Sequence, residues 1–199
     1  MKGSLMKRLL FTITLVMSAS LLVAAPASAD DRRCTGTIGA THIDGNVIVP
    51  QGADCTLRGT RVDGNVIVKG DAKLVARGVK VDGNIQAENH RNVIVTTREV
   101  GDRTVKSRVE GDIQLDSGKR GRVAKAVIGG DLQVKQNSGR QVAVHNRIDG
   151  DLQAFSNDGG FRIYRNQIDG NLQCKGNDPK PHGGQNQVSG NKEDQCSSL

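Results

Sequence analysis

A seven-residue motif, Ile43-Asp44-Gly45-Asn46-Val47-Ile48-Val49, recurs along the chain and constrains the fold more than any other feature. Its glycine returns at a nearly constant interval, as Gly45, Gly64, Gly83, Gly111, Gly130, Gly150, Gly170 and Gly190. The steps between these glycines are 19, 19, 28, 19, 20, 20 and 20 residues. A fixed period in this range is typical of a solenoid, in which each repeat forms one coil of a stacked column.

Each copy places apolar residues two positions before the glycine and two and four positions after it. This period of two predicts strands with one buried face, and the glycine fits an inward position where the chain bends. We therefore predict an all-β, single-domain right-handed parallel β-helix (a solenoid) of about eight coils of 19–20 residues, covering residues 30–199. The same alternation predicts that Val93, Val95, Val142 and Val144 point inward.

Two segments interrupt this rhythm, and a third ends it. Arg98 to Thr104 accounts for most of the extra length of the 28-residue step, so we expect a bulge there. Gly176 to Gly184 is rich in Gly and Pro, which predicts a projecting loop. Asn191 to Leu199 is polar, which suits a cap over the last coil.

The first 29 residues have the organisation of a secretory signal peptide. Lys2, Lys7 and Arg8 precede an apolar run from Leu9 to Ala25, and Ala27-Ser28-Ala29 supplies a cleavage site. Cleavage would leave no transmembrane anchor, whereas an uncleaved N-terminal anchor is the alternative. Loss of the three cations lowers the net charge from +7 to +4. We expect a periplasmic or secreted protein whose mild basicity makes nucleic acid an unlikely partner.

All four cysteines lie in the part expected to be exported, where an even number indicates disulfides. Cys34 and Cys55 occupy similar places in successive coils, and Cys174 and Cys196 are also about one coil apart. We therefore favour the pairs Cys34–Cys55 and Cys174–Cys196, one at each end of the solenoid. A metal site is the alternative, but no Cys-x-x-Cys spacing supports it.

Polar residues form further columns in the predicted coils. Asn146, Asn166 and Asn186 each lie four positions before a glycine, which predicts an internal asparagine ladder. Outward acids precede the glycines at Asp44, Asp63, Asp82, Glu110, Asp149 and Asp169. Cations two positions before the acids, such as Arg61 and Arg147, favour ion pairs on this face. Calcium binding by the stacked oxygens is the alternative.

The candidate interaction residues belong to an outward glutamine column, to one coil with aromatic residues and to the irregular segment after Arg98. An outward glutamine column either stacks on itself, as in cross-β ladders, or meets the hydroxyls of a glycan. The aromatic residues of one coil either bind a partner or widen the core. The candidates are Phe155, Phe161, Tyr164, Arg98, Arg103, Gln133, Gln153 and Gln173.

No converging set of catalytic residues is visible in the sequence. His42, His90, His145 and His182 are scattered over four coils. We predict neither catalytic residues nor a cofactor or metal. The leading hypothesis is a non-enzymatic scaffold or interaction protein of the bacterial envelope, which binds itself, an envelope protein or a polysaccharide. A glycan-binding envelope or matrix protein is second, and a polysaccharide-modifying enzyme is third.

The recurrence of Gly-Asn-Val-Ile-Val between Ile43 and Ala87 resembles the bactofilins, the polymer-forming cytoskeletal proteins of bacteria. The resemblance is looser from Val109 to Cys174. It implies a compact right-handed β-helix with about one winding per repeat. It also implies end-to-end assembly into non-polar filaments without nucleotide.

Overall fold

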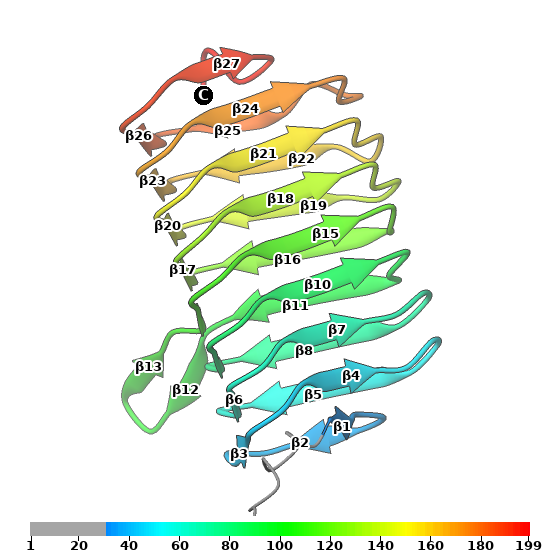
Figure 1. Ribbon diagram of the computed structural model, residues 1–199. Coiled ribbons are helices and arrows are strands. Elements are labelled where there is room, and N and C mark those ends of the chain that lie inside the picture. Colours follow the sequence, from blue (N-terminus) through cyan, green and yellow to red (C-terminus); the bar gives the residue numbers. More distant parts are fainter. Residues whose placement is uncertain (1–30) are drawn as a thin grey trace, which may run out of the picture.

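A computed structural model describes residues 31–199, which form one column of stacked coils with three parallel sheets as its sides (Figure 1). The prediction of an all-β solenoid is confirmed. The predicted signal peptide, residues 1–29, lies outside the described residues.

Each sheet collects one strand from every coil. Sheet A runs in the order β1 (Arg32–Arg33), β4 (Val47–Val49), β7 (Val66–Val68), β10 (Ile85–Glu88), β15 (Ile113–Asp116), β18 (Leu132–Lys135), β21 (Leu152–Phe155), β24 (Leu172–Lys175) and β27 (Lys192–Asp194). Sheet B runs β2 (Thr37–Ile38), β5 (Asp54–Arg58), β8 (Lys73–Arg77), β11 (Asn92–Thr96), β16 (Arg120–Ala124), β19 (Gln141–Val144), β22 (Phe161–Tyr164) and β25 (His182–Gly184). Sheet C runs β3 (His42–Ile43), β6 (Arg61–Val62), β9 (Lys80–Val81), β14 (Arg108–Val109), β17 (Val127–Ile128), β20 (Arg147–Ile148), β23 (Gln167–Ile168) and β26 (Gln187–Val188).

The core is a set of aliphatic columns that the strand register keeps in line. On sheet A, for example, Val66 pairs with Ile85 and Ile85 pairs with Ile113, and all three side chains are fully buried. The alternation of buried and outward residues follows from the pleat of the strands. Small and branched aliphatic residues therefore fill a narrow interior that leaves room for few aromatic rings.

Strand β19 departs from the predicted alternation by one position. Ala143 points inward, Val142 is half-buried on the outer face, and Gln141 is 1% exposed. The amide of Gln141 donates to the carbonyls of Lys119 and Gly139. The prediction that Val142 points inward was wrong, because Gln141 and Ala143 hold the inward positions of this strand, which shifts the alternation by one residue.

The motif glycines are required by the close stacking of one corner of the coil. The N–H of Gly64 donates to the carbonyl of Gly45 at 3.2 Å. A Cβ atom on Gly64 would lie 2.6 Å from Oδ1 of Asn46 and 2.8 Å from that carbonyl oxygen. These glycines do not have positive φ angles. Their function is thus to allow close approach rather than to adopt an unusual backbone conformation.

The expected bulge after Arg98 is an antiparallel hairpin, β12 (Arg98–Val100) and β13 (Arg103–Val105), which projects from the side of the column (Figure 1). In contrast, the prediction of a projecting loop at Gly176–Gly184 is wrong. The N–H of Asp178 bonds to the carbonyl of Asn157, and β25 pairs in register with β22. The segment therefore follows the path of the preceding coil.

The predicted internal asparagine ladder is confirmed. Asn146 donates its Nδ2 to Oδ1 of Asn166, which donates in turn to Oδ1 of Asn186, both at 3.0 Å. Each amide also donates to a backbone carbonyl of the preceding coil, as Asn166 does to Ala143. The ladder therefore satisfies the polar groups of this buried corner.

A second ladder, which was not predicted, lies at the corner between sheets A and B. Asn137 donates to Asn157, Asn157 to Asn177, and Asn177 to Gln195, at 2.9 to 3.0 Å. The sequence could have predicted this ladder, because Asn137, Asn157 and Asn177 recur at 20-residue intervals. The ladder continues the column into the last coil.

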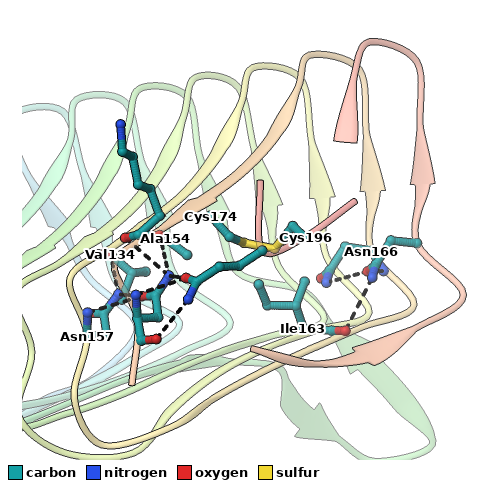
Figure 2. Close-up of a disulfide and its surroundings, with 11 residues drawn as sticks. Val134, Ala154, Asn157, Ile163, Asn166, Cys174 and Cys196 are labelled. Carbon is teal, nitrogen blue, oxygen red and sulfur yellow. Dashed lines mark hydrogen bonds between the residues drawn. A yellow bond between two sulfur atoms is a disulfide. The ribbon is translucent and has the colours of Figure 1, made fainter. Parts of the chain in front are cut away.

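Both predicted disulfides are confirmed, Cys34–Cys55 and Cys174–Cys196. Their Cα atoms are 5.5 and 5.3 Å apart, and all four cysteines are buried. Figure 2 shows the second bridge together with Asn157 and Asn166. Residues 195–199 form turns in which Cys196 and Leu199 are buried. The expected C-terminal cap is therefore present, held by the disulfide.

Candidate functional site

The outer face of sheet A carries the glutamine column and a shallow depression. The glutamines stack in register along the strands, with Gln133 beside Gln153 and Gln153 beside Gln173. A depression of about 310 Å³ is lined by the amides of Gln86, Gln114 and Gln133 and by neighbouring charged residues. The face therefore offers both hydrogen-bond donors and acceptors.

The glutamines do not bond to one another along the axis. Gln133 donates to Asp131 and accepts from Lys135, and Gln173 donates to Glu193. Among residues 31–199, no hydrogen bond joins two side chains of this column. Self-stacking through amide bonds, the first interpretation of the column, is therefore wrong. Carboxylates on the same face, including that of Glu193 in the last coil, accept hydrogen bonds from the glutamine amides instead.

The three candidate aromatic residues lie in three different environments. Phe155 is half-buried on sheet A, where Nζ of Lys135 lies 5.7 Å from its ring centroid. Phe161 is 1% exposed and belongs to the core, so its assignment as an interaction residue was wrong. Tyr164 is on sheet B, between the guanidinium groups of Arg162 and Arg165 at 5.2 and 4.9 Å. The coil therefore has no single aromatic patch.

The hairpin carries Arg98 and Arg103 on different parts of its surface. Arg98 is half-buried against the column, with Nη1 donating to the carbonyl of Arg58 at 3.4 Å. Arg103 is exposed near the hairpin tip. Val100 and Val105 are 46% and 41% exposed, and they are the exposed large hydrophobic residues of the described chain. Arg98 thus anchors the hairpin, whereas Arg103 is accessible to a partner.

Sheet C carries the predicted network of ion pairs. Arg61 binds Asp63 at 3.0 Å and Asp82 at 2.7 Å, and Arg147 binds Asp149 at 3.0 Å and Asp169 at 3.4 Å. Each arginine therefore bridges two successive coils. This pairing neutralises most of the acidic column, as the sequence predicted.

One group of sheet C residues has the composition of a cation site. His42, Asp44 and Asp63 place one ligand atom each within 4.8 Å of one another. Hydrogen bonding to His42, together with Arg61, holds the pKa of Asp63 below its ordinary value. Because all three side chains are exposed and Asp63 is already shared by two cations, ion pairing accounts for the group.

The residues that follow the motif glycines form a column of Asn and Asp side chains, for which the sequence pattern predicts solvated ladder residues, but the structure gives them a backbone-binding role. Their Oδ1 atoms accept the backbone N–H of the next coil at 2.6 to 2.9 Å, from Asn46 through to Asn171. Asp112, Asp131 and Asp151 each use one carboxylate oxygen in this way. The column therefore belongs to the scaffold.

Sheet B carries a cluster that the sequence analysis did not identify. Its exposed members on successive strands are Arg120, Arg122, Arg140 and Arg162, which we call the sheet B arginine patch. They line a depression of about 520 Å³ together with Asn92, Ile94, Gly121 and Val142. A signal was present, since Arg120 and Arg122 alternate on one strand and Arg140 follows Arg120 after 20 residues.

Comparisons with family models, curated proteins and solved structures found no match.

Two general properties of the described chain bear on its environment. The two buried disulfides fit an oxidising extracellular compartment. Residues 31–199 contain no helix long and apolar enough to cross a membrane.

Proposed function

We propose that this chain is an exported, non-enzymatic structural or interaction protein of the bacterial envelope, which acts as a single rigid column and binds through its sides. The observation that carries the proposal is the way the column ends. Residues 195–199 cover the last coil and are fixed by Cys174–Cys196, and a second disulfide closes the first coils. A covered end is a poor surface for coil-on-coil stacking.

The two edge strands of sheet A support the same conclusion. Strand β27 consists of Lys192, Glu193 and Asp194, and β1 consists of Arg32 and Arg33. Charged residues on a sheet edge oppose pairing with another chain. The resemblance to bactofilins would imply filaments, so these ends favour a member of the same solenoid class that works as a monomer. Export is supported by the signal sequence pattern and by the disulfides.

The decisive experiment measures mass and shape in solution. We expect a monomer by size-exclusion chromatography with light scattering, and an elongated particle by small-angle X-ray scattering. Filaments or large particles in negative-stain microscopy of the oxidised protein would overturn the proposal. Fusion of residues 1–29 to a reporter that is active only outside the cytoplasm tests export separately.

A second candidate, recognition of a neutral glycan, is favoured by the glutamine-lined depression on sheet A. Carbohydrate hydroxyls need paired donors and acceptors, which Gln86, Gln114 and Gln133 supply. Binding on an array of neutral glycans that disappears with Gln133→Ala would support it. Unchanged binding by that variant would place any glycan elsewhere.

A further inference from the structure

The sheet B arginine patch brings together four arginines that have no acidic partner in the described chain, whereas three arginines elsewhere on the column are paired. Arg61, Arg91 and Arg147 each bind at least one aspartate. In residues 31–199, none of the four patch arginines takes part in an ion pair, and no acid lines their depression. Strands β16, β19, β22 and β25 contain no Asp or Glu. The patch is therefore a concentration of uncompensated positive charge.

Strand register determines how the four guanidinium groups are spaced. Gly121 pairs with Gln141, so Arg120 and Arg140 are neighbours in adjacent coils. Arg122 pairs with Val142, which pairs with Arg162, so these two arginines are two coils apart, or about 10 Å. Arg120 and Arg122 are separated by about 7 Å along their strand. The charges thus form a strip that runs along the column axis across three coils.

The floor of the depression is partly apolar. Ile94 and Val142 are half-buried there, between the exposed arginines. The guanidinium groups donate five N–H groups each, accept none and stay charged at any working pH. A ligand for this surface must therefore supply anionic acceptors along its length, with some apolar surface between them.

We propose that the sheet B arginine patch binds a linear, carboxylate-bearing polysaccharide that lies along the column axis. Guanidinium groups match carboxylates through paired hydrogen bonds, and the C–H faces of sugar rings suit the Ile94–Val142 floor. The proposal rests on the proposed export and lateral use of the column, and it identifies the class of partner.

Two other polyanions fit the surface less well. Single-stranded nucleic acid is usually held by bases stacked on aromatic side chains, and no aromatic residue lines the depression. The nearby Tyr164 ring already contacts Arg162 and Arg165. An anionic membrane would favour protruding apolar residues, yet the exposed Val100 and Val105 lie on the hairpin and not in the patch.

The test compares two double variants with equal loss of charge. Arg122→Gln/Arg162→Gln removes two patch arginines, and Arg61→Gln/Arg147→Gln removes two exposed arginines of sheet C that are already paired. The probe is oligogalacturonate, with a neutral dextran of matched length as control, in calorimetry of the oxidised full-length mature chain. We expect the patch variant to lose affinity roughly tenfold or more, and the sheet C variant to change by less than about twofold. Raising the salt concentration should weaken binding of the native chain.

Three results would overturn the proposal: no binding of oligogalacturonate, equal weakening by both double variants, or tighter binding of single-stranded DNA or anionic vesicles through the same arginines. Circular dichroism and thermal unfolding of both variants establish that the coils remain intact. Failure of the proposed function appears in a different measurement, because filaments of the unliganded protein would be detected by light scattering whatever the patch binds.

Discussion

The imidazole of His90 occupies the space that a side chain on Gly118, in the next coil, would need. Both residues belong to the column that continues as Asn137, Asn157 and Asn177. His90 is fully buried, and Gly118 bonds through its N–H to Oδ1 of Asn137 at 2.9 Å. A large residue in one coil is thus accommodated by the absence of a side chain in the next.

This relationship predicts that Gly118→Asn destabilises the protein, by about 1–3 kcal/mol, because the new side chain overlaps the ring. The double variant His90→Ala/Gly118→Asn should recover much of that loss, since it continues the asparagine ladder by one coil. Urea unfolding of the two single variants and the double variant measures the coupling. Additive effects of the two substitutions would show that the residues do not compete for one space.

Stability should also depend on pH through His90. Burial lowers its pKa below the ordinary value of 6.5, although backbone groups of Ala87 and Arg120 and the charge of Asp116 oppose the shift. Neither ring nitrogen has a hydrogen-bond partner in the described structure. The unfolded chain therefore binds this proton at a higher pH than the folded chain does. The stability that His90 contributes is complete above pH 6.5 and is lost as the pH falls through its folded pKa.

We expect the free energy of unfolding to fall between pH 7.5 and pH 5, and to fall less in His90→Gln than in the native chain. The exposed His145 offers a control, because His145→Gln should keep the native pH dependence. Identical pH profiles for the native chain and His90→Gln would contradict the assignment.

Asn166→Ala should destabilise the column by roughly 3 kcal/mol, because it leaves buried donors and acceptors unpaired. Asn166 accepts from the N–H and Nδ2 of Asn146 and donates to Ala143 and Asn186. Gln153→Ala, on the outer face, should change stability by about 0.5 kcal/mol or less. Chemical denaturation of both variants provides the comparison, and equal effects would show that the ladder contributes nothing beyond an exposed amide.

Most of the fold was predictable because the glycine period and the two-residue alternation act on every coil. The cysteine pairing was predictable for the same reason, since the period places Cys34 and Cys55 in adjacent coils. The inward position of Gln141 was not predictable from the sequence. Its amide donates to the carbonyls of Lys119 and Gly139, which only the assembled coils bring within reach. The burial of Phe161 was not predictable either, because Phe161 pairs with Gln141, which pairs with Gly121, and all three residues hold inward positions.

The hairpin should be removable without loss of the fold. In other coils two residues connect sheet B to sheet C, and the first of them, such as Gly59, Gly78 or Lys125, has a positive φ. Deletion of residues 98–106 with Thr97→Gly would leave one such residue and restore the 19-residue step. We expect a cooperative thermal transition within a few degrees of the native one. Loss of the cooperative transition would show that Arg98 and its contact with Arg58 are needed for folding.

The interaction faces were harder to predict than the fold. A column of glutamines is visible in the sequence, but its hydrogen bonds to Asp131, Lys135 and Glu193 depend on which residues share the face. The arginine patch was overlooked because its residues follow two different columns, one through Arg120 and one through Arg122. The spacing of Arg120 and Arg122 makes these columns neighbours, but the register is needed to show that Arg162 joins them and that no acid lies between them.

The Cys174–Cys196 bridge has a mechanical consequence. A pulling force applied at Leu199 reaches Cys196 after three residues and then crosses the sulfur bridge into the preceding coil. The final coil therefore carries almost no tension and cannot be peeled away first. Cys34–Cys55 transfers a load from the other end in the same way. Under tension, the first hydrogen bonds to open in the described column therefore lie between the two disulfides and not in the terminal coils.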